Sequence, residues 1–165
     1  MTPVPRPTLW ISIAGVLAVT AYAALAAVQI LVLNPLAAAP GGLSLDEVRA
    51  AMSNAGESLM PQAVLGILGA GVCLGIGTAV VCVVTRVHPI VPAMTFLAVL
   101  MGGAPAYFVA SFGPGMGLAD TFGISGADAS PWALPLYAVS ALAAVGVLIG
   151  AALTSRRRGP ASATA

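Results

Sequence analysis

The residue types that most often do chemistry in proteins are missing from the apolar parts of this sequence. Its 165 residues include five acids, six arginines, no lysine and one histidine. None of them falls within the four long apolar runs of the chain. A charge at the centre of a membrane helix costs roughly 3 kcal/mol and is normally retained for ion or proton handling. We therefore expect no proton-coupled transport through these runs.

The remaining candidates do not form a catalytic or metal-binding set. Gly123-Ile124-Ser125-Gly126 matches the GxSG pattern of rhomboid intramembrane proteases, but no histidine follows it and the serine falls in a predicted loop. His88 is expected in a turn, with no acid on its side of the membrane to pair with it. Asp120 and Asp128 supply far fewer than the six to eight oxygens that calcium prefers. We predict no catalytic residue, no metal and no cofactor.

The two cysteines are predicted to be small apolar packing residues. Cys73 and Cys82 lie in one apolar run, about 13.5 Å apart along a helix at 1.5 Å per residue. A disulfide needs Cα atoms within about 7 Å of each other, so these two cannot bridge within one helix.

Composition places most of the chain in lipid. The sequence is 59% hydrophobic and 7% charged, and about 20 apolar residues are enough to cross a hydrocarbon layer of about 30 Å. We predict an all-α membrane protein, a single domain formed by residues 1–165, with four transmembrane helices in a bundle. The predicted spans are 9–33, 62–85, 90–112 and 133–153.

The first run also has features of a signal peptide. Arg6 precedes it, and Ala21-Tyr22-Ala23 resembles a cleavage site. The run continues to Leu33 and is too long for the apolar region of such a peptide, so we expect an uncleaved helix.

The connections differ in their predicted structure. Ser44-Leu45-Asp46-Glu47 fits a capping box, and apolar residues recur after it at helical spacing, so a short amphipathic surface helix is predicted over 44–55, outside the cytoplasm. Residues 113–132 contain several glycines and are predicted to be a loop without a helix of its own. The tail 154–165 is expected to be cytoplasmic.

Small residues four apart predict close helix packing. Gly71, Gly75 and Ala79 share one face of the second span, and Gly146 and Gly150 share one face of the fourth. Such faces let membrane helices approach closely. Parallel rows in the second span are Gly66 with Ala70, and Gly69 with Cys73 and Gly77. The sequence leaves open whether the partner helix belongs to this chain or to another.

The third span contains a predicted bend. Gly102 and Gly103 precede Pro105, which cannot donate a hydrogen bond to the carbonyl of Met101. Gln29 is the most polar side chain of the first span. These four residues, Gln29, Gly102, Gly103 and Pro105, are the candidates for lining a cavity, with ordinary packing as the alternative.

Charge predicts the orientation. Arg6, Arg86 and the three arginines Arg156, Arg157 and Arg158 fall on one side of the predicted spans, and Arg49 falls on the other. The positive-inside rule then places both termini in the cytoplasm, with Arg86 and Arg156–Arg158 as topology anchors in a cell membrane, which we expect to be bacterial. A net charge of +1 argues against a nucleic-acid partner.

Three functions remain open from the sequence. The leading hypothesis is a non-enzymatic subunit or accessory factor of a membrane assembly, with lipid and other membrane proteins or copies of itself as partners. The alternative is a small channel or facilitator with a path near Pro105, and the third is an intramembrane enzyme. The sequence identifies neither a ligand nor a pathway.

Overall fold

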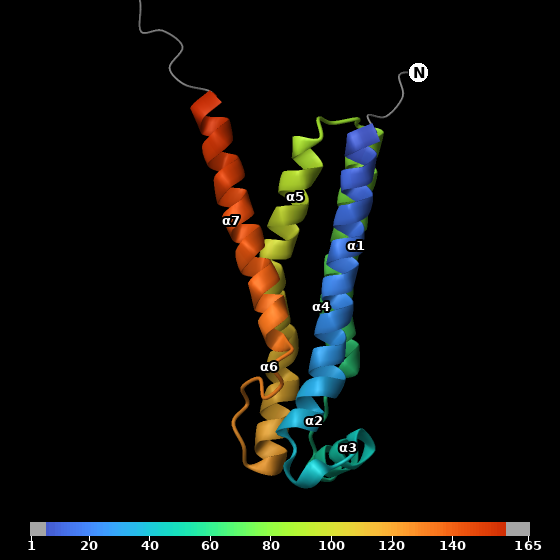
Figure 1. Ribbon diagram of the computed structural model, residues 1–165. Helices are drawn as coiled ribbons and strands as arrows, with labels where there is room; N and C mark the ends of the chain where they lie inside the picture. Colours follow the sequence, from blue (N-terminus) through green and yellow to red (C-terminus); the bar gives the residue numbers. More distant parts are fainter. Residues whose placement is uncertain (1–5, 158–165) are drawn as a thin grey trace, which may run out of the picture.

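The chain is all-helical and contains four helical segments long and apolar enough to cross a membrane (Figure 1). A computed structural model describes residues 6–157, and this part contains no strand. The four segments are Arg6–Ala38, Pro61–Val84, Ile90–Phe122 and Ala133–Ser155. The predicted class, a membrane protein with four spans, agrees with this arrangement.

The helices follow one another through short connections. Helix α1 (Arg6–Val28) continues through a π-helical turn (Gln29–Leu33) into α2 (Asn34–Ala38), and a 3₁₀ turn (Pro40–Gly42) leads to the short helix α3 (Leu45–Asn54). The remaining helices are α4 (Pro61–Val84), α5 (Ile90–Met101), α6 (Gly103–Phe122) and α7 (Ala133–Arg157). Arg158 lies outside the described residues.

The first span is longer than predicted, because a π turn accommodates Pro35. A proline ring normally clashes with the carbonyl four residues before it. Here the N–H of Asn34 donates to the carbonyl of Gln29, five residues back, as in a π-bulge. The helical path therefore continues past Leu33 into α2.

The predicted loop over 113–132 is wrong for its first half, since α6 continues to Phe122. The glycines that suggested a loop serve close packing instead. A Cβ atom on Gly115 would lie 2.7 Å from the carbonyl oxygen of Gly126, and one on Gly117 would lie 3.0 Å from Cε of Met52. Helix α6 tolerates Pro114 internally, and the chain turns only at Gly123, which has a left-handed φ of 65°.

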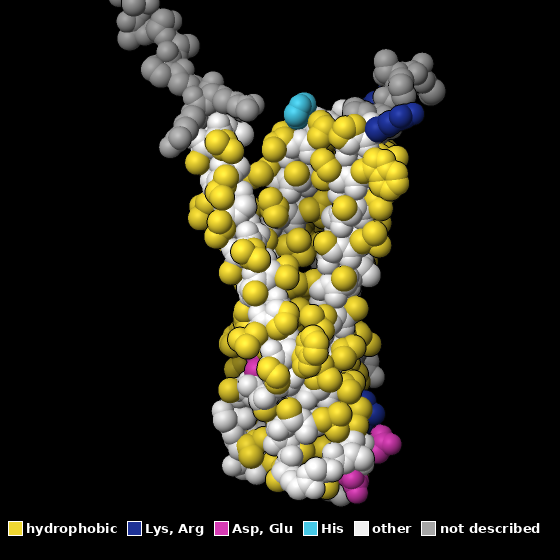
Figure 2. All heavy atoms as spheres, viewed as in Figure 1, with side chains coloured by type: hydrophobic (Ala, Val, Ile, Leu, Met, Phe, Trp, Pro, Cys, Tyr) yellow, Lys and Arg dark blue, Asp and Glu magenta, His cyan; other side chains and the backbone are white. Residues whose placement is uncertain are grey.

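The bundle has one basic end and one acidic end. The basic end carries the start of α1, the α4–α5 turn and the end of α7, and the acidic end carries α2, α3 and the α6–α7 connection (Figure 1). Figure 2 shows the surface between them as mostly hydrophobic. Helices α1 and α4 form the most extensive pair, α5 pairs with α7 and α1, and α7 diverges from α1 toward the basic end.

A small second core lies at the acidic end. Val48 and Met52 of α3 are buried against Leu118 of α6, and Leu59 and Ala39 complete the cluster. The apolar side of α3 therefore faces the extension of α6, which covers residues that a helix at the water interface would otherwise expose.

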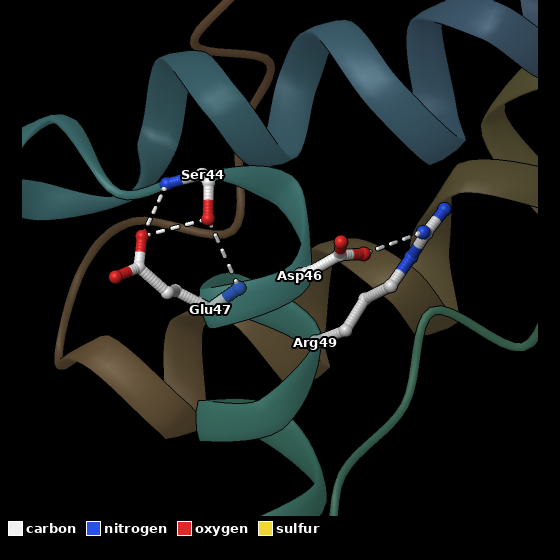
Figure 3. Close-up of polar contacts among 4 residues, drawn as sticks. All are labelled: Ser44, Asp46, Glu47 and Arg49. Carbon is white, nitrogen blue, oxygen red and sulfur yellow. Dashed lines mark hydrogen bonds and ion pairs between the residues drawn. The ribbon is translucent and has the colours of Figure 1, made fainter.

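The capping box predicted for α3 is present (Figure 3). The Glu47 carboxylate accepts hydrogen bonds from the Ser44 hydroxyl at 2.7 Å and the Ser44 N–H at 2.8 Å, and the Glu47 N–H donates to the Ser44 hydroxyl oxygen at 3.4 Å. The two bonds to the carboxylate, first the one from the Ser44 hydroxyl and then the one from the Ser44 N–H, lower the pKa of Glu47 below its ordinary value of 4.5. Arg49 and Asp46 form an exposed ion pair at 3.5 Å.

Replacing Ser44 by alanine should make the amides at the start of α3 exchange faster, because their cap is lost. Hydrogen exchange followed by mass spectrometry measures this, with Ser53→Ala as the exposed control.

The stability of the start of α3 should also depend on pH. Because the folded pKa of Glu47 is lowered, the contribution of its carboxylate to this stability is present above pH 4.5 and is lost as the pH falls through the folded pKa. The measured exchange rates of these amides are corrected for the pH dependence of intrinsic exchange. Corrected rates that stay constant over this pH range would contradict the role of Glu47.

Candidate functional site

The predicted bend of the third span is a break between two helices. Helix α5 ends at Met101 and α6 begins at Gly103, with the Gly102 N–H donating to the Ala98 carbonyl at 3.1 Å. Pro105 lies in the first turn of α6, where its missing N–H costs least.

Two other helices supply hydroxyl groups to this break. The Ser140 hydroxyl of α7 donates to the carbonyl oxygen of Leu100 at 2.9 Å and lies 3.3 Å from the Tyr22 hydroxyl oxygen of α1. Ser140 is buried. In lipid, a backbone carbonyl released from its helix must find a donor within the protein. The break is thus stabilised by bonds that tie α5 to α7 and bring α1 alongside.

Gly103 is required by the close approach of Tyr22. A Cβ atom at position 103 would lie 2.7 Å from Cζ and 2.9 Å from Cε1 of the Tyr22 ring. Gly15, nearer the start of α1 than Tyr22, permits a similar close approach. A Cβ atom at this position would collide with the ring of Phe96. The sequence patterns did not single out Gly15, because it has no small neighbour four residues away.

A cavity of about 430 Å³ lies next to the break, between α1, α4 and α5. Gly102 and Gly103 line it, as the sequence suggested, and Gly71 lines it from α4. Gln29 and Pro105 do not belong to its lining. The polar side chains of the lining are the hydroxyls of Tyr22, Thr78 and Thr95, with no Asp, Glu, His or Arg among the described lining residues. The cavity suits an apolar ligand better than an ion or acid–base chemistry.

Gln29 lies instead in a polar cluster at the acidic end. Its side chain is fully buried, and its Nε2 donates to the carbonyl of Ser130 at 3.4 Å. One turn later, Asn34 Oδ1 accepts from the N–H groups of Ala129 at 2.7 Å and Ser130 at 3.3 Å. Two amide side chains on the π turn and α2 therefore hold the segment that leads into α7.

Asp128 completes this cluster. Its carboxylate accepts from the hydroxyls of Tyr107 at 2.6 Å and Tyr137 at 3.2 Å. The two tyrosine rings meet edge to face, with centroids 5.5 Å apart. Asp128 is exposed, and the sequence did not indicate these two bonds, because no spacing rule relates position 128 to a tyrosine 21 residues earlier.

The predicted small-residue faces have different surroundings. A Cβ atom on Gly75 would lie 3.5 Å from Val19, one on Gly146 would lie 3.1 Å from Leu97, and one on Gly150 would collide with Met94. These positions therefore belong to contacts within the chain. Ala79 lines a groove between α1 and α4, and a Cβ atom on Gly71 would meet no other atom within 4 Å.

A second face of α4 is left open. Cβ atoms built on Gly66, Gly69 and Gly77 would also meet nothing within 4 Å, and Ala70 and Cys73 between them are exposed. We refer to Gly66, Ala70, Cys73 and Gly77 as the open row.

The described residues contain no group of three metal-ligating side chains. Ser125 is exposed and accepts a hydrogen bond from the Ala127 N–H at 3.2 Å, as expected in a turn. Arg86 lies in the α4–α5 turn with a left-handed φ of 53°, and Arg156 and Arg157 end α7.

No family model, no curated protein and no solved structure matches this chain.

Replacing Gly103 by alanine should destabilise the bundle by about 1–3 kcal/mol, because the added methyl group overlaps the Tyr22 ring. Unfolding in detergent micelles measures the change. Gly69→Ala is the matched control, since its methyl group enters open space and should stabilise the helix by up to about 1 kcal/mol. Equal effects of the two substitutions would contradict the packing at the break.

Replacing Asn34 by alanine should release the segment before α7, because the N–H groups of Ala129 and Ser130 lose their acceptor. Ser130 is buried, and a buried donor left unpaired costs about 1–3 kcal/mol. Limited proteolysis within residues 123–132 should become faster. The control is Asn54→Ala, at the exposed end of α3, and proteolysis no faster than in this control would refute the assignment.

Proposed function

We propose that this protein is a non-enzymatic subunit or accessory factor of a membrane assembly, bound to its partner through a transmembrane helix that packs on the open row of α4. The observation that carries the proposal is the difference between the two glycine faces of this helix. A Cβ atom on Gly75 would contact Val19 and Phe96, whereas a Cβ atom on Gly66 or Gly77 would meet no atom of another helix within 4 Å.

An uncovered glycine row matters more in lipid than in water. Lipid tails are as apolar as leucine, so membrane helices associate through close packing of small residues rather than through hydrophobic burial. Each glycine in a helix interior also costs about 1 kcal/mol relative to alanine. A partner helix on the open row would offset that cost, and no helix of this chain does so among the described residues.

For the orientation, we infer that the basic end faces the cytoplasm of a bacterial cell. Five arginines belong to that end in sequence, against Arg49 at the other. Both termini are then cytoplasmic, and α3 is an extracytoplasmic amphipathic helix. The acidic end would be available to partners outside the cell membrane.

The cavity at the break gives less support to a channel. Its lining is apolar apart from three hydroxyls, and Gln29 lies outside it. An enzyme finds less support still, because Ser125 and His88 lie at opposite ends of the bundle.

A photo-crosslinker tests the proposed helix contact. A diazirine analogue of leucine at Val80, which is 56% exposed and lies beside the open row, should crosslink to a discrete membrane protein in native membranes. The same analogue at Leu142, 71% exposed on α7, should give only lipid and background products. The mass of the product distinguishes a second copy from a different subunit.

Substitution of the row provides the matched control. Gly66→Leu should abolish the crosslink from Val80 because it fills the row, and it should leave the folded monomer intact, since its Cβ meets nothing. Gly71→Leu lies on another face of the same helix and should preserve the crosslink. An equal crosslink from Val80 and Leu142, or one that Gly66→Leu leaves unchanged, would refute the proposal.

A further inference from the structure

The cavity at the helix break continues as a groove toward the basic end. A second hollow of about 510 Å³ lies between α4 and α5 and shares Leu74, Thr78 and Thr95 with the cavity. It begins at Val87 in the α4–α5 turn, whereas the cavity extends to Ala106 in α6. We call the combined feature the α4–α5 groove.

The groove exists because two glycines and one aromatic residue leave it empty. Gly71 and Gly77 on α4 present no side chain toward it, and Cβ atoms on them would meet nothing within 4 Å. The ring of Phe96, which could fill the space from α5, packs on Gly15 and Gly75 of the opposite side. The tightly packed core thus lies beside the groove and does not enter it.

The dimensions of the groove suit a lipid chain. From Val91 to Ala106 the helical rise is about 22 Å at 1.5 Å per residue. This is more than half of a hydrocarbon layer about 30 Å thick. The deep end is lined by Tyr22 and Gly103, and the groove walls are apolar apart from hydroxyls. One acyl chain that enters from the basic end would reach the break.

The mouth of the groove carries one cation, Arg86, and one neutral hydrogen-bond donor, His88, that an anionic headgroup can use. Val87 lines the mouth, with Arg86 and His88 on either side of it in the chain. Thr8 Oγ1 donates to the Val87 carbonyl at 3.0 Å and fixes the turn to α1. The His88 Nδ1 accepts from the Ile90 N–H at 3.4 Å, which leaves Nε2 as a donor.

All acids of the described chain lie toward the other end. Figure 2 shows the acidic side chains in the half of the bundle opposite to the arginine and histidine at the basic end. A phosphate at the mouth would therefore meet basic groups and no carboxylate. A basic residue near a membrane surface attracts anionic lipid by about fivefold in affinity.

We propose that the α4–α5 groove binds one anionic phospholipid, with its phosphate at Arg86 and His88 and one acyl chain between α4 and α5 as far as the break. This site does not depend on the proposed helix contact, although Cys73 and Gly77 belong to both surfaces. The bound lipid would lie beside any helix on the open row.

Native mass spectrometry of the full chain in detergent tests the site with two probes, dioleoylphosphatidylglycerol and dioleoylphosphatidylcholine. One molecule of the anionic lipid should bind with a half-saturation concentration roughly fivefold lower or more than that of the neutral lipid. This preference should shrink at high salt, which screens exposed charges. Equal binding of the two lipids would overturn the proposal.

Variants locate the two parts of the lipid. Gly71→Leu fills the groove and should abolish the saturable adduct, whereas Gly66→Leu, the same change on the open row, should preserve it. Arg86→Asn places a residue that tolerates the left-handed conformation at this turn and should lower the affinity for the anionic lipid roughly fivefold. Arg49→Gln at the acidic end is the control and should leave this affinity unchanged.

The outcomes separate this proposal from the previous one. If Gly71→Leu binds the anionic lipid as the natural chain does, the groove is not the site. If Gly66→Leu abolishes the crosslink from Val80 but still binds the anionic lipid, both proposals stand. If Gly66→Leu keeps the crosslink and loses the lipid adduct, both proposals are refuted. His88→Ala removes the Nε2 donor at the mouth and gives an independent readout should Arg86→Asn fail to fold, and unchanged binding of the anionic lipid in His88→Ala would then refute the headgroup position.

Discussion

The hydrogen bond from Ser140 to the Leu100 carbonyl is the interaction on which the arrangement of the bundle depends. A helix that breaks in a membrane releases backbone groups that water cannot reach. Here the break is supported by a hydroxyl from α7, with the phenol of Tyr22 beside it. Because these groups come from three different helices, the break fixes their mutual positions as well as the direction of α6. The close fit of Gly103 against Tyr22 belongs to the same constraint.

The two ends of the bundle are held by different means. Toward the acidic end, α6 is enclosed by α4 and α7, and the amides of Gln29 and Asn34 hold the segment that starts α7. Toward the basic end, α7 diverges from α1, and the bond from Thr8 to Val87 ties α1 to the α4–α5 turn. The acidic half is therefore the more interlocked part. The basic half contains the groove.

The sequence was sufficient for the features that depend on local pattern or on length. Long apolar runs specify the spans, Ser44 and Glu47 specify the cap of α3, and Pro105 after two glycines specifies the break. Residues 113–122 were misassigned because glycine breaks a helix in water but permits close contact in a packed one, as Gly115 does against Gly126. The π turn at Gln29 and the bonds of Asp128 to Tyr107 and Tyr137 depend on distant partners, which one sequence does not reveal. The orientation and the surface helix outside the membrane stay predictions.

The hydrogen bonds between distant helices also determine when the bundle can finish assembling during synthesis. Gln29 and Asn34 bond to residues 95 to 101 positions later, and Tyr22 meets Ser140 across 118 positions. The first helix must therefore remain in the membrane, with its glutamine and tyrosine not yet bonded to their final partners, until the last helix has entered. The pairing of α1 with α4 and α5 needs only the first two thirds of the chain and can form earlier. Contacts of such long sequence separation are slow to form, so the interval before α7 arrives is the period in which this protein is most exposed to misassembly.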